Sequence, residues 1–453
     1  MITSAFIVSV RNLPMMAETG MSMIFFALIA CLGFLIPASL VSAELATGWP
    51  IRGGVYVWVK EAFGDRYGFL AIWLQWIQNV VWYPTILSFI GATFAFIFNP
   101  AMAENKIYLL IVILTVYWVT TYANFHGMKI SGHISTICLV AGVLLPAILI
   151  ISLGVTYLVE GNPLQIDASF TTNNLLPNMS NIRSIALLSG FIYAALGIEM
   201  SAVHAEEVHN PERNYPIAIF MAAALLLIVN IFGSLSIAIV ISQKEISLVA
   251  GLMQAFNIFL DNFAISWLLP IISLLVVIGA IGQISTCIIG PSKGIFTAAK
   301  EGYLPHFIQR VNKKGIPTHL LLVQASIVTA LSLIFLYMPT VSDSYWILMN
   351  LTGLLYLMMY LLMFTAAIRL RQIKPNVHRD YKIPGGNVGM YLIAGIGLIT
   401  VVCIFFIGFF PPSQFAIENI VFYEVFLVSG VVIMLVIPLL IHHLRKPSWI
   451  IQA

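Results

Sequence analysis

The chain consists of long apolar stretches separated by short polar interruptions. Charges, turn residues and prolines divide it into twelve apolar segments, most of them near the ~20 residues that an α-helix needs to cross a bilayer. We therefore predict an all-α polytopic membrane protein with twelve transmembrane helices. The segments cover 2–18, 21–45, 67–98, 107–125, 132–158, 184–205, 215–242, 263–291, 318–339, 344–368, 388–410 and 421–443.

The composition agrees with a lipid environment. Of 453 residues, 60% are hydrophobic and only 9% are charged, compared with roughly 25% charged in soluble domains. Such a chain cannot cover a water-facing surface, which excludes a soluble enzyme and a nucleic-acid-binding protein. No polar stretch is long enough to bury a core of its own, so no ATPase domain is expected. The four cysteines form no CxxC pair, and neither a zinc site nor any other cofactor is predicted.

The basic residues are distributed unevenly between alternate loops. With the N-terminus inside, 17 of the 21 lysines and arginines fall in predicted cytoplasmic loops or the C-terminal tail. The opposite loops contain Lys106, Arg183 and Lys244, and Arg11 lies within the first segment. Because basic loops stay on the cytoplasmic side, we predict that both termini are cytoplasmic.

Two segments contain a polar interruption. The first has the run Ser9 to Pro14, and the sixth has Gly197 and Glu199 near its centre. Transporters commonly bind their substrate where two discontinuous helices meet at the midplane. The alternative is a kink without function, which glycine and proline often produce in membrane helices. We favour the substrate site, because each interruption also contains an ionisable residue.

Three motifs follow one another along the chain. They read Ala43-Glu44-Leu45-Ala46 with Trp49-Pro50 and Gly53-Gly54, then Gly197-Ile198-Glu199 with Glu207 and Asn210-Pro211, then Gly290-Pro291-Ser292-Lys293-Gly294 with Gly302-Tyr303-Leu304-Pro305. Together they resemble the signatures of amino acid permeases in the amino acid/polyamine/organocation (APC) superfamily. The similarity is closest to the bacterial glutamate/GABA antiporter branch, which also shares Ile383-Pro384-Gly385-Gly386.

The resemblance implies a fold of two inverted five-helix repeats, 1–158 and 184–368, followed by two additional helices in 388–443. It implies a secondary active amino acid transporter of the bacterial inner membrane that works by alternating access, most often as an antiporter, and is not an enzyme. A proton-coupled symporter is the alternative within this class. From another class, a membrane sensor or partner subunit could retain the fold without transporting.

Arg11 and Glu199 are the candidate charged residues of the site. A guanidinium binds carboxylates bidentately, so we expect Arg11 to recognise a substrate carboxylate or to pair with Glu199. If the first segment is not a true span, Arg11 instead anchors the chain at the cytoplasmic face. The first segment is short for this family, so either its first half-helix is truncated or Met1 is not the biological start. Glu199 is expected to be the proton-coupling residue, because acids within the membrane are usually functional. The alternative is a structural carboxylate that stabilises the broken helix.

Further substrate-binding residues are expected near the two breaks and in the third and eighth segments. Each could instead make ordinary helix-to-helix contacts. Gln283 and Cys287 replace an acid and a tryptophan of the nearest relatives, which argues against a simple transfer of glutamate/GABA specificity. The predicted set, in addition to Arg11, is Asn12, Asn79, Trp82, Tyr193, Ala195, Gly197, Gln283, Thr286 and Cys287.

Three other polar groups occur along the chain. Glu44 and Arg52 are expected to form part of the cytoplasmic gate, and a purely structural salt bridge is the alternative. Hydroxyls at Ser285 and Thr286 could bind sodium, although such hydroxyls commonly bond to their own helix. The group around His204 and His209 has the composition of a metal site, but a solvated loop is favoured and no metal is predicted.

Overall fold

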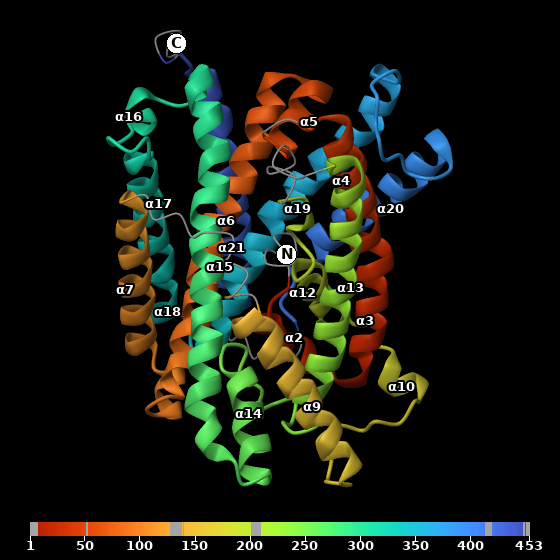
Figure 1. Ribbon diagram of the computed structural model, residues 1–453, viewed down its shortest axis with the longest axis vertical. Coiled ribbons are helices and arrows are strands. Elements are labelled where there is room, and N and C mark those ends of the chain that lie inside the picture. Colours follow the sequence, from red (N-terminus) through yellow and green to blue (C-terminus); the bar gives the residue numbers. More distant parts are fainter. Residues whose placement is uncertain are drawn as a thin grey trace.

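The computed structural model describes residues 8–50, 53–126, 138, 140–200, 210–412, 419–446 and 449. Within these ranges every regular element is helical, and no strand is found. The helices form one elongated bundle (Figure 1). This is the all-α architecture that the apolar segments predict.

The first half of the chain contains the short helix α2, the interrupted second span, and the long helix α6 at the centre of the bundle. The second span continues from α3 through a π-helical turn, η3, into α4. The helix α5 occupies a stretch that we predicted to be a loop. The bounds are η1 Val10–Asn12, α2 Leu13–Ala17, α3 Met23–Ala30, η3 Cys31–Leu35, α4 Ile36–Gly48, α5 Val55–Phe63, α6 Asp65–Ala95, α7 Lys106–Phe125, η5 Val140–Leu144 and α9 Leu145–Val159.

The second half contains the broken sixth span, α11 and α12, and the long helices α13, α15 and α19. The helix α14 was also predicted as a loop. The bounds are α10 Thr172–Leu175, α11 Ile182–Ile185, α12 Leu187–Tyr193, α13 Pro211–Ala238, α14 Gly251–Asn262, α15 Leu269–Ala298, η8 Ala299–Tyr303, α16 His306–Gln309, α17 Thr318–Ser332, α18 Ile334–Tyr337, α19 Val341–Ile373, α20 Gly386–Ile407 and α21 Ile420–His443.

Ten helical stretches in the described part of the chain are long and apolar enough to cross a membrane, and each overlaps a predicted segment. The predicted segments 2–18 and 67–98 are not among them. The helix α6 has 31 residues and is long enough, but the amides of Gln75, Gln78 and Asn79 reduce its hydropathy. The count of twelve spans and the two inverted repeats therefore remain predictions.

The centre of the bundle is formed by α6, α15 and α19, with the broken helices beside them. The helix α19 packs against α6 and α20, and α15 packs against α6. By contrast, α20 and α21 expose large apolar side chains such as Leu392, Ile399 and Val421. Exposed apolar side chains of this kind suit contact with lipid.

Both predicted interruptions are present in the backbone. Ser9 is extended and its hydroxyl accepts a hydrogen bond from the Arg11 amide, which starts the 3-10 turn before α2. The sixth span stops being α-helical after Tyr193, and Gly197 has a φ of +100°. Only glycine adopts that region readily, so Gly197 ends one half of the span. The regular helix is therefore interrupted at both predicted positions.

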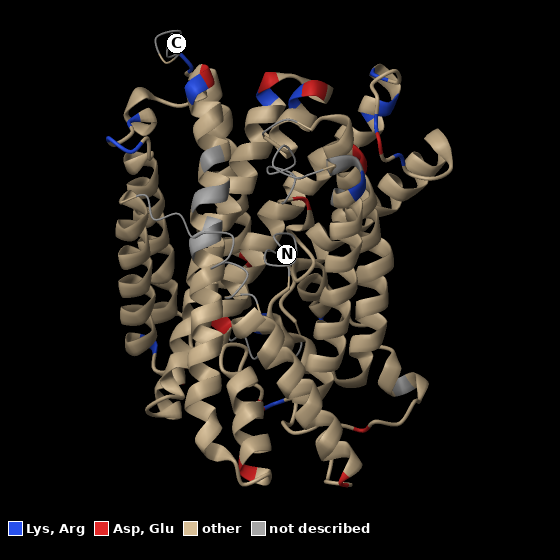
Figure 2. Cartoon of the chain, viewed as in Figure 1, with Lys and Arg blue, Asp and Glu red and all other residues tan. Residues whose placement is uncertain are grey.

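Lysines and arginines gather at the end of the bundle that carries α5 and α16 (Figure 2). The opposite end, where α10 and α14 lie, has few of them. We call these the basic end and the opposite end. This distribution is what the positive-inside rule produces when one end faces the cytoplasm.

Candidate functional site

A cavity of about 80 Å³ lies where the two helix breaks meet α6, α15 and α19. We call it the central cavity. Seven of the predicted substrate-binding residues line it, together with Gln78, Leu196, Met200, Met349, Thr352, Gly353 and Tyr356 among others. The seven are Arg11, Asn12, Asn79, Trp82, Tyr193, Gly197 and Gln283.

The remaining predicted residues lie elsewhere or are not described. Ala195 lines a separate, largely apolar pocket with Met16 and Phe191. It does not line the central cavity, although its neighbours Leu196 and Gly197 do. Thr286 and Cys287 belong to α15, but their side chains lie outside the described part, as do Arg52 and the region of His204 and His209.

Arg11 is the charged residue of the central cavity. It is 7% exposed, and its Nη1 donates a 2.7 Å hydrogen bond to Thr85 Oγ1 on α6. The guanidinium lies over the rings of Trp82 and Tyr345, 5.3 and 5.7 Å from their centroids. Stacked aromatic rings and a hydroxyl fix the direction of the fork. The cavity is therefore lined by one oriented cation and several amides, a combination that suits a carboxylate ligand.

Glu199 lies beside the central cavity and is held by residues of two other helices. It is 1% exposed. Its Oε1 accepts hydrogen bonds of 2.7 Å from Tyr356 and 3.3 Å from Gln75, and its Oε2 accepts one from Tyr360. The Tyr360 hydroxyl in turn accepts a 3.0 Å hydrogen bond from the backbone N–H of Gly197.

This arrangement joins the break of the sixth span to α6 and α19. The sequence analysis missed Tyr356 and Tyr360. Their spacing of four residues places both hydroxyls on one face of an apolar helix, a signal that could have identified them. Because Tyr356 also lines the central cavity, it connects the cavity wall to the carboxyl group.

Tyr193 is fixed by a second buried network. Its hydroxyl donates a 2.7 Å hydrogen bond to Asn350 Oδ1. Asn350 Nδ2 in turn donates a 2.5 Å hydrogen bond to the Gly408 carbonyl and another to the Tyr423 hydroxyl. Gly353 leaves the space for the ring, since a Cβ there would lie 2.3 Å from Tyr193 Cε1. The aromatic wall of the cavity is thus coupled to α20 and α21.

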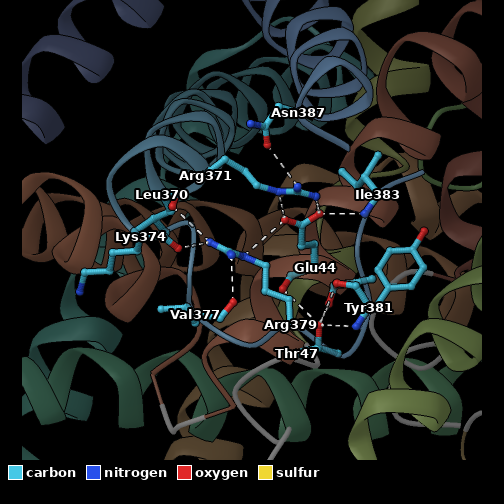
Figure 3. A network of polar contacts seen from close by, with 11 residues as sticks. Glu44, Thr47, Leu370, Arg371, Lys374, Val377, Arg379, Tyr381, Ile383 and Asn387 are labelled. Carbon is cyan, nitrogen blue, oxygen red and sulfur yellow. Dashed lines mark hydrogen bonds and ion pairs between the residues drawn. The ribbon is translucent and has the colours of Figure 1, made fainter. Parts of the chain in front are cut away.

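Glu44 on α4 forms a buried ion-pair network (Figure 3). The helix α4 lies beside α5 toward the basic end (Figure 1). Arg371 Nε and Nη2 donate hydrogen bonds of 2.5 and 2.7 Å to the two oxygens of Glu44, and the backbone N–H of Ile383 donates another of 2.8 Å. Arg379 Nε lies 3.5 Å from Glu44 Oε1. Arg371, Arg379 and the Ile383 backbone are thus the described partners of Glu44, and Arg52 lies outside the described residues.

Arg379 also ties the loop before α20 to the end of α19. Its Nη2 donates 3.1 Å hydrogen bonds to the carbonyls of Leu370 and Lys374. Burial lowers the pKa of Arg379, and the negative charge of Glu44 opposes that shift. The network therefore links α4, α19 and the loop through one carboxylate.

Comparisons with known proteins agree with this architecture. The sequence model of a family described as amino acid permease matches residues 1–436. An uncharacterized transporter of Legionella pneumophila is 44% identical over 95% of this chain and 92% of its own length. A glutamate/gamma-aminobutyrate antiporter of Lactococcus lactis is 32% identical over 98% of this chain and 89% of its own length. A probable agmatine/putrescine antiporter of the same species is 24% identical over 86% of this chain and 82% of its own length.

Both the matched family and these relatives are transporters, and ten helical stretches in the described part of the chain are long and apolar enough to cross a membrane. The chain therefore belongs to the amino acid permease family of the APC superfamily and is an integral membrane amino acid transporter.

Proposed function

We propose that this protein is an amino acid antiporter that exchanges an amino acid for a related amino acid or amine by alternating access. The observation that carries the proposal is the central cavity, which places an oriented guanidinium and several amides between two helix breaks. The names of the Lactococcus relatives support exchange rather than one-way transport.

In this proposal the backbone N–H groups at the breaks bind the α-carboxylate of the substrate. The Arg11 guanidinium binds a second carboxylate in substrates that carry one. Asn79, Trp82, Tyr193 and Gln283 shape the rest of the cavity, as the sequence analysis expects. The basic end faces the cytoplasm of a bacterium, so that both termini are inside. Glu44 with its two arginines then belongs to the cytoplasmic gate, because separating α4 from α19 requires this buried ion pair to break.

Proton-coupled symport is the second candidate, and Glu199 is the observation that favours it. A buried carboxyl group that accepts from two tyrosine hydroxyls next to the cavity is placed to take up and release a proton as the helices move. Glu199 has this coupling role in either candidate, since an antiporter can carry a proton as well.

Uptake into proteoliposomes separates the candidates. Obligatory exchange requires uptake to be much faster into vesicles preloaded with amino acid than into empty ones. Equal uptake into empty vesicles contradicts exchange, and its acceleration by an inward proton gradient supports symport. No uptake under either condition, from protein that binds amino acids, indicates a sensor or partner subunit.

A further inference from the structure

A second cavity lies near the opposite end of the bundle, where α10 is seen (Figure 1). We call it the outer cavity. Its volume is about 400 Å³. It is lined by the residues that follow α2, by the loop around Gln165 and Asp167, by α10, and by Gln243 after α13. The outer cavity shares no lining residue with the central cavity. It therefore needs an explanation of its own.

Glu18 is the unusual residue of the outer cavity. It follows directly after α2 and is only 6% exposed. Its Oε2 is buried and has no hydrogen-bond partner among the described residues. The nearby hydroxyls already donate to backbone carbonyls. Thr19 Oγ1 donates a 2.7 Å hydrogen bond to the Met16 carbonyl, and Ser22 Oγ donates one of 2.7 Å to the Thr19 carbonyl.

A buried carboxylate without a partner is costly to the folded protein. The usual compensation is a basic side chain, yet no Lys, Arg or His occurs among the described residues that line the outer cavity. A ligand that carries positive charge would supply what the protein itself does not.

The rest of the wall is also suited to a cation. Hydrogen bonds from the Asn174 side chain and from Ser169 lower the pKa of Asp167, so this exposed carboxyl group stays charged at neutral pH. Amide side chains of Gln165, Asn174 and Gln243 provide additional oxygens. The backbone N–H of Gln165 donates 2.9 Å to the Ile239 carbonyl, which attaches this loop to the end of α13.

We propose that Glu18 is the anionic centre of a binding site for the ammonium group of a small amine or amino acid. An ammonium group has three donors and one positive charge, which match one buried carboxylate surrounded by amide oxygens. The cavity is far larger than the close shell of oxygens that a dehydrated metal ion needs. The site is separate from the central cavity, and its existence does not depend on exchange or symport.

The test measures binding to the purified full-length protein in lipid nanodiscs. The thermal unfolding midpoint is measured while methylammonium chloride is substituted stepwise for tetramethylammonium chloride, which has no N–H donor. The ionic strength stays constant throughout. We expect saturable stabilisation of the unchanged protein and an apparent Kd at least about tenfold higher in Glu18→Gln, as loss of one charge-assisted hydrogen bond predicts. Gln283→Ala, which alters only the central cavity, should retain the effect.

Equal stabilisation of the unchanged protein and Glu18→Gln would overturn the proposal, and so would loss of the effect in Gln283→Ala with retention in Glu18→Gln. Sodium chloride is the second probe. If sodium stabilises the protein as much as methylammonium does, the assignment to an ammonium group is wrong.

A second variant keeps the test decisive if Glu18→Gln does not fold. Gln243→Glu adds a carboxylate to the same cavity and should lower the apparent Kd for methylammonium severalfold. The added charge should have no such effect if the outer cavity binds nothing. Unchanged or weaker binding in Gln243→Glu would therefore contradict the proposal.

Discussion

The Tyr356 hydroxyl donates a 2.7 Å hydrogen bond to Glu199 Oε1 and also lines the central cavity. One side chain thus contacts both the space for substrate and the carboxyl group that we propose as the proton carrier. A substrate that displaces Tyr356 changes the hydrogen bonds of Glu199 directly. Proton uptake and substrate binding then influence each other through a single contact, without a longer pathway.

The first prediction concerns this contact. Glu199→Gln keeps the shape of the side chain but cannot release a proton, so transport should lose its dependence on pH while the protein still folds. Tyr356→Phe removes one hydrogen bond from the carboxylate and should shift the pH profile rather than abolish it. Both are measured as initial uptake rates into proteoliposomes between pH 5 and 8. An unchanged profile in Glu199→Gln would show that Glu199 is structural.

The second prediction concerns Arg11. Removing the guanidinium in Arg11→Ala should raise KM about tenfold to a hundredfold for L-glutamate, the cost of one or two charge-assisted hydrogen bonds. L-alanine, which lacks the second carboxylate, should be affected less. Thr85→Val is the matched control, because it removes only the hydroxyl that holds Arg11 in place. Equal losses for both substrates in Arg11→Ala would instead indicate a structural role.

The third prediction concerns the Glu44 network. Glu44→Gln leaves two buried arginines without a countercharge and should cost about 3–5 kcal/mol of stability, read as a lower thermal unfolding midpoint. Glu61 provides the control, because its ion pair with Lys374 is about one-third exposed. Glu61→Gln should therefore cost less than about 1 kcal/mol.

If Glu44 belongs to the cytoplasmic gate, the same variant should also open the path to the central cavity more readily. In Glu44→Gln, a cysteine placed at Asn79 should react faster with a membrane-impermeant maleimide added from the basic end. Destabilisation without faster labelling would favour the purely structural salt bridge.

The helix breaks could be predicted from the sequence because their causes are local. Pro14 lies in the first turn of α2, where its missing N–H is tolerated, and Gly197 has a positive φ. The polar residues beside both are visible in the chain. The convergence of Asn79 and Gln283 on the breaks was expected from the resemblance to a family, and periodicity alone would not have given it. The apolar segments likewise predicted all ten stretches in the described residues that are long and apolar enough to cross a membrane.

The missed features depend on residues far apart in the chain. Glu44 and Arg371 are separated by 327 positions, and nothing local in either segment identifies the other as its partner. Asn350 and the pair Tyr356 and Tyr360 acquire their roles only when α19 packs beside the sixth span. The helices α5 and α14 were missed because segments were chosen by apolar length, and short helices at a bundle end are amphipathic.

The last prediction tests how Tyr193 is positioned. A Cβ at residue 353 would lie 2.3 Å from Tyr193 Cε1, so Gly353→Ala must displace the ring. The ring cannot move freely, because its hydroxyl is bonded to Asn350 in a buried network. Overpacking of this kind costs about 1–3 kcal/mol, and we expect a lower unfolding midpoint together with weaker substrate binding.

Gly395→Ala is the matched control, since no atom lies within 4 Å of its added Cβ. That change should leave substrate binding as it is and slightly stabilise α20, because alanine favours a helix by ~1 kcal/mol over glycine. Normal substrate affinity in Gly353→Ala would show that the position of Tyr193 does not determine binding.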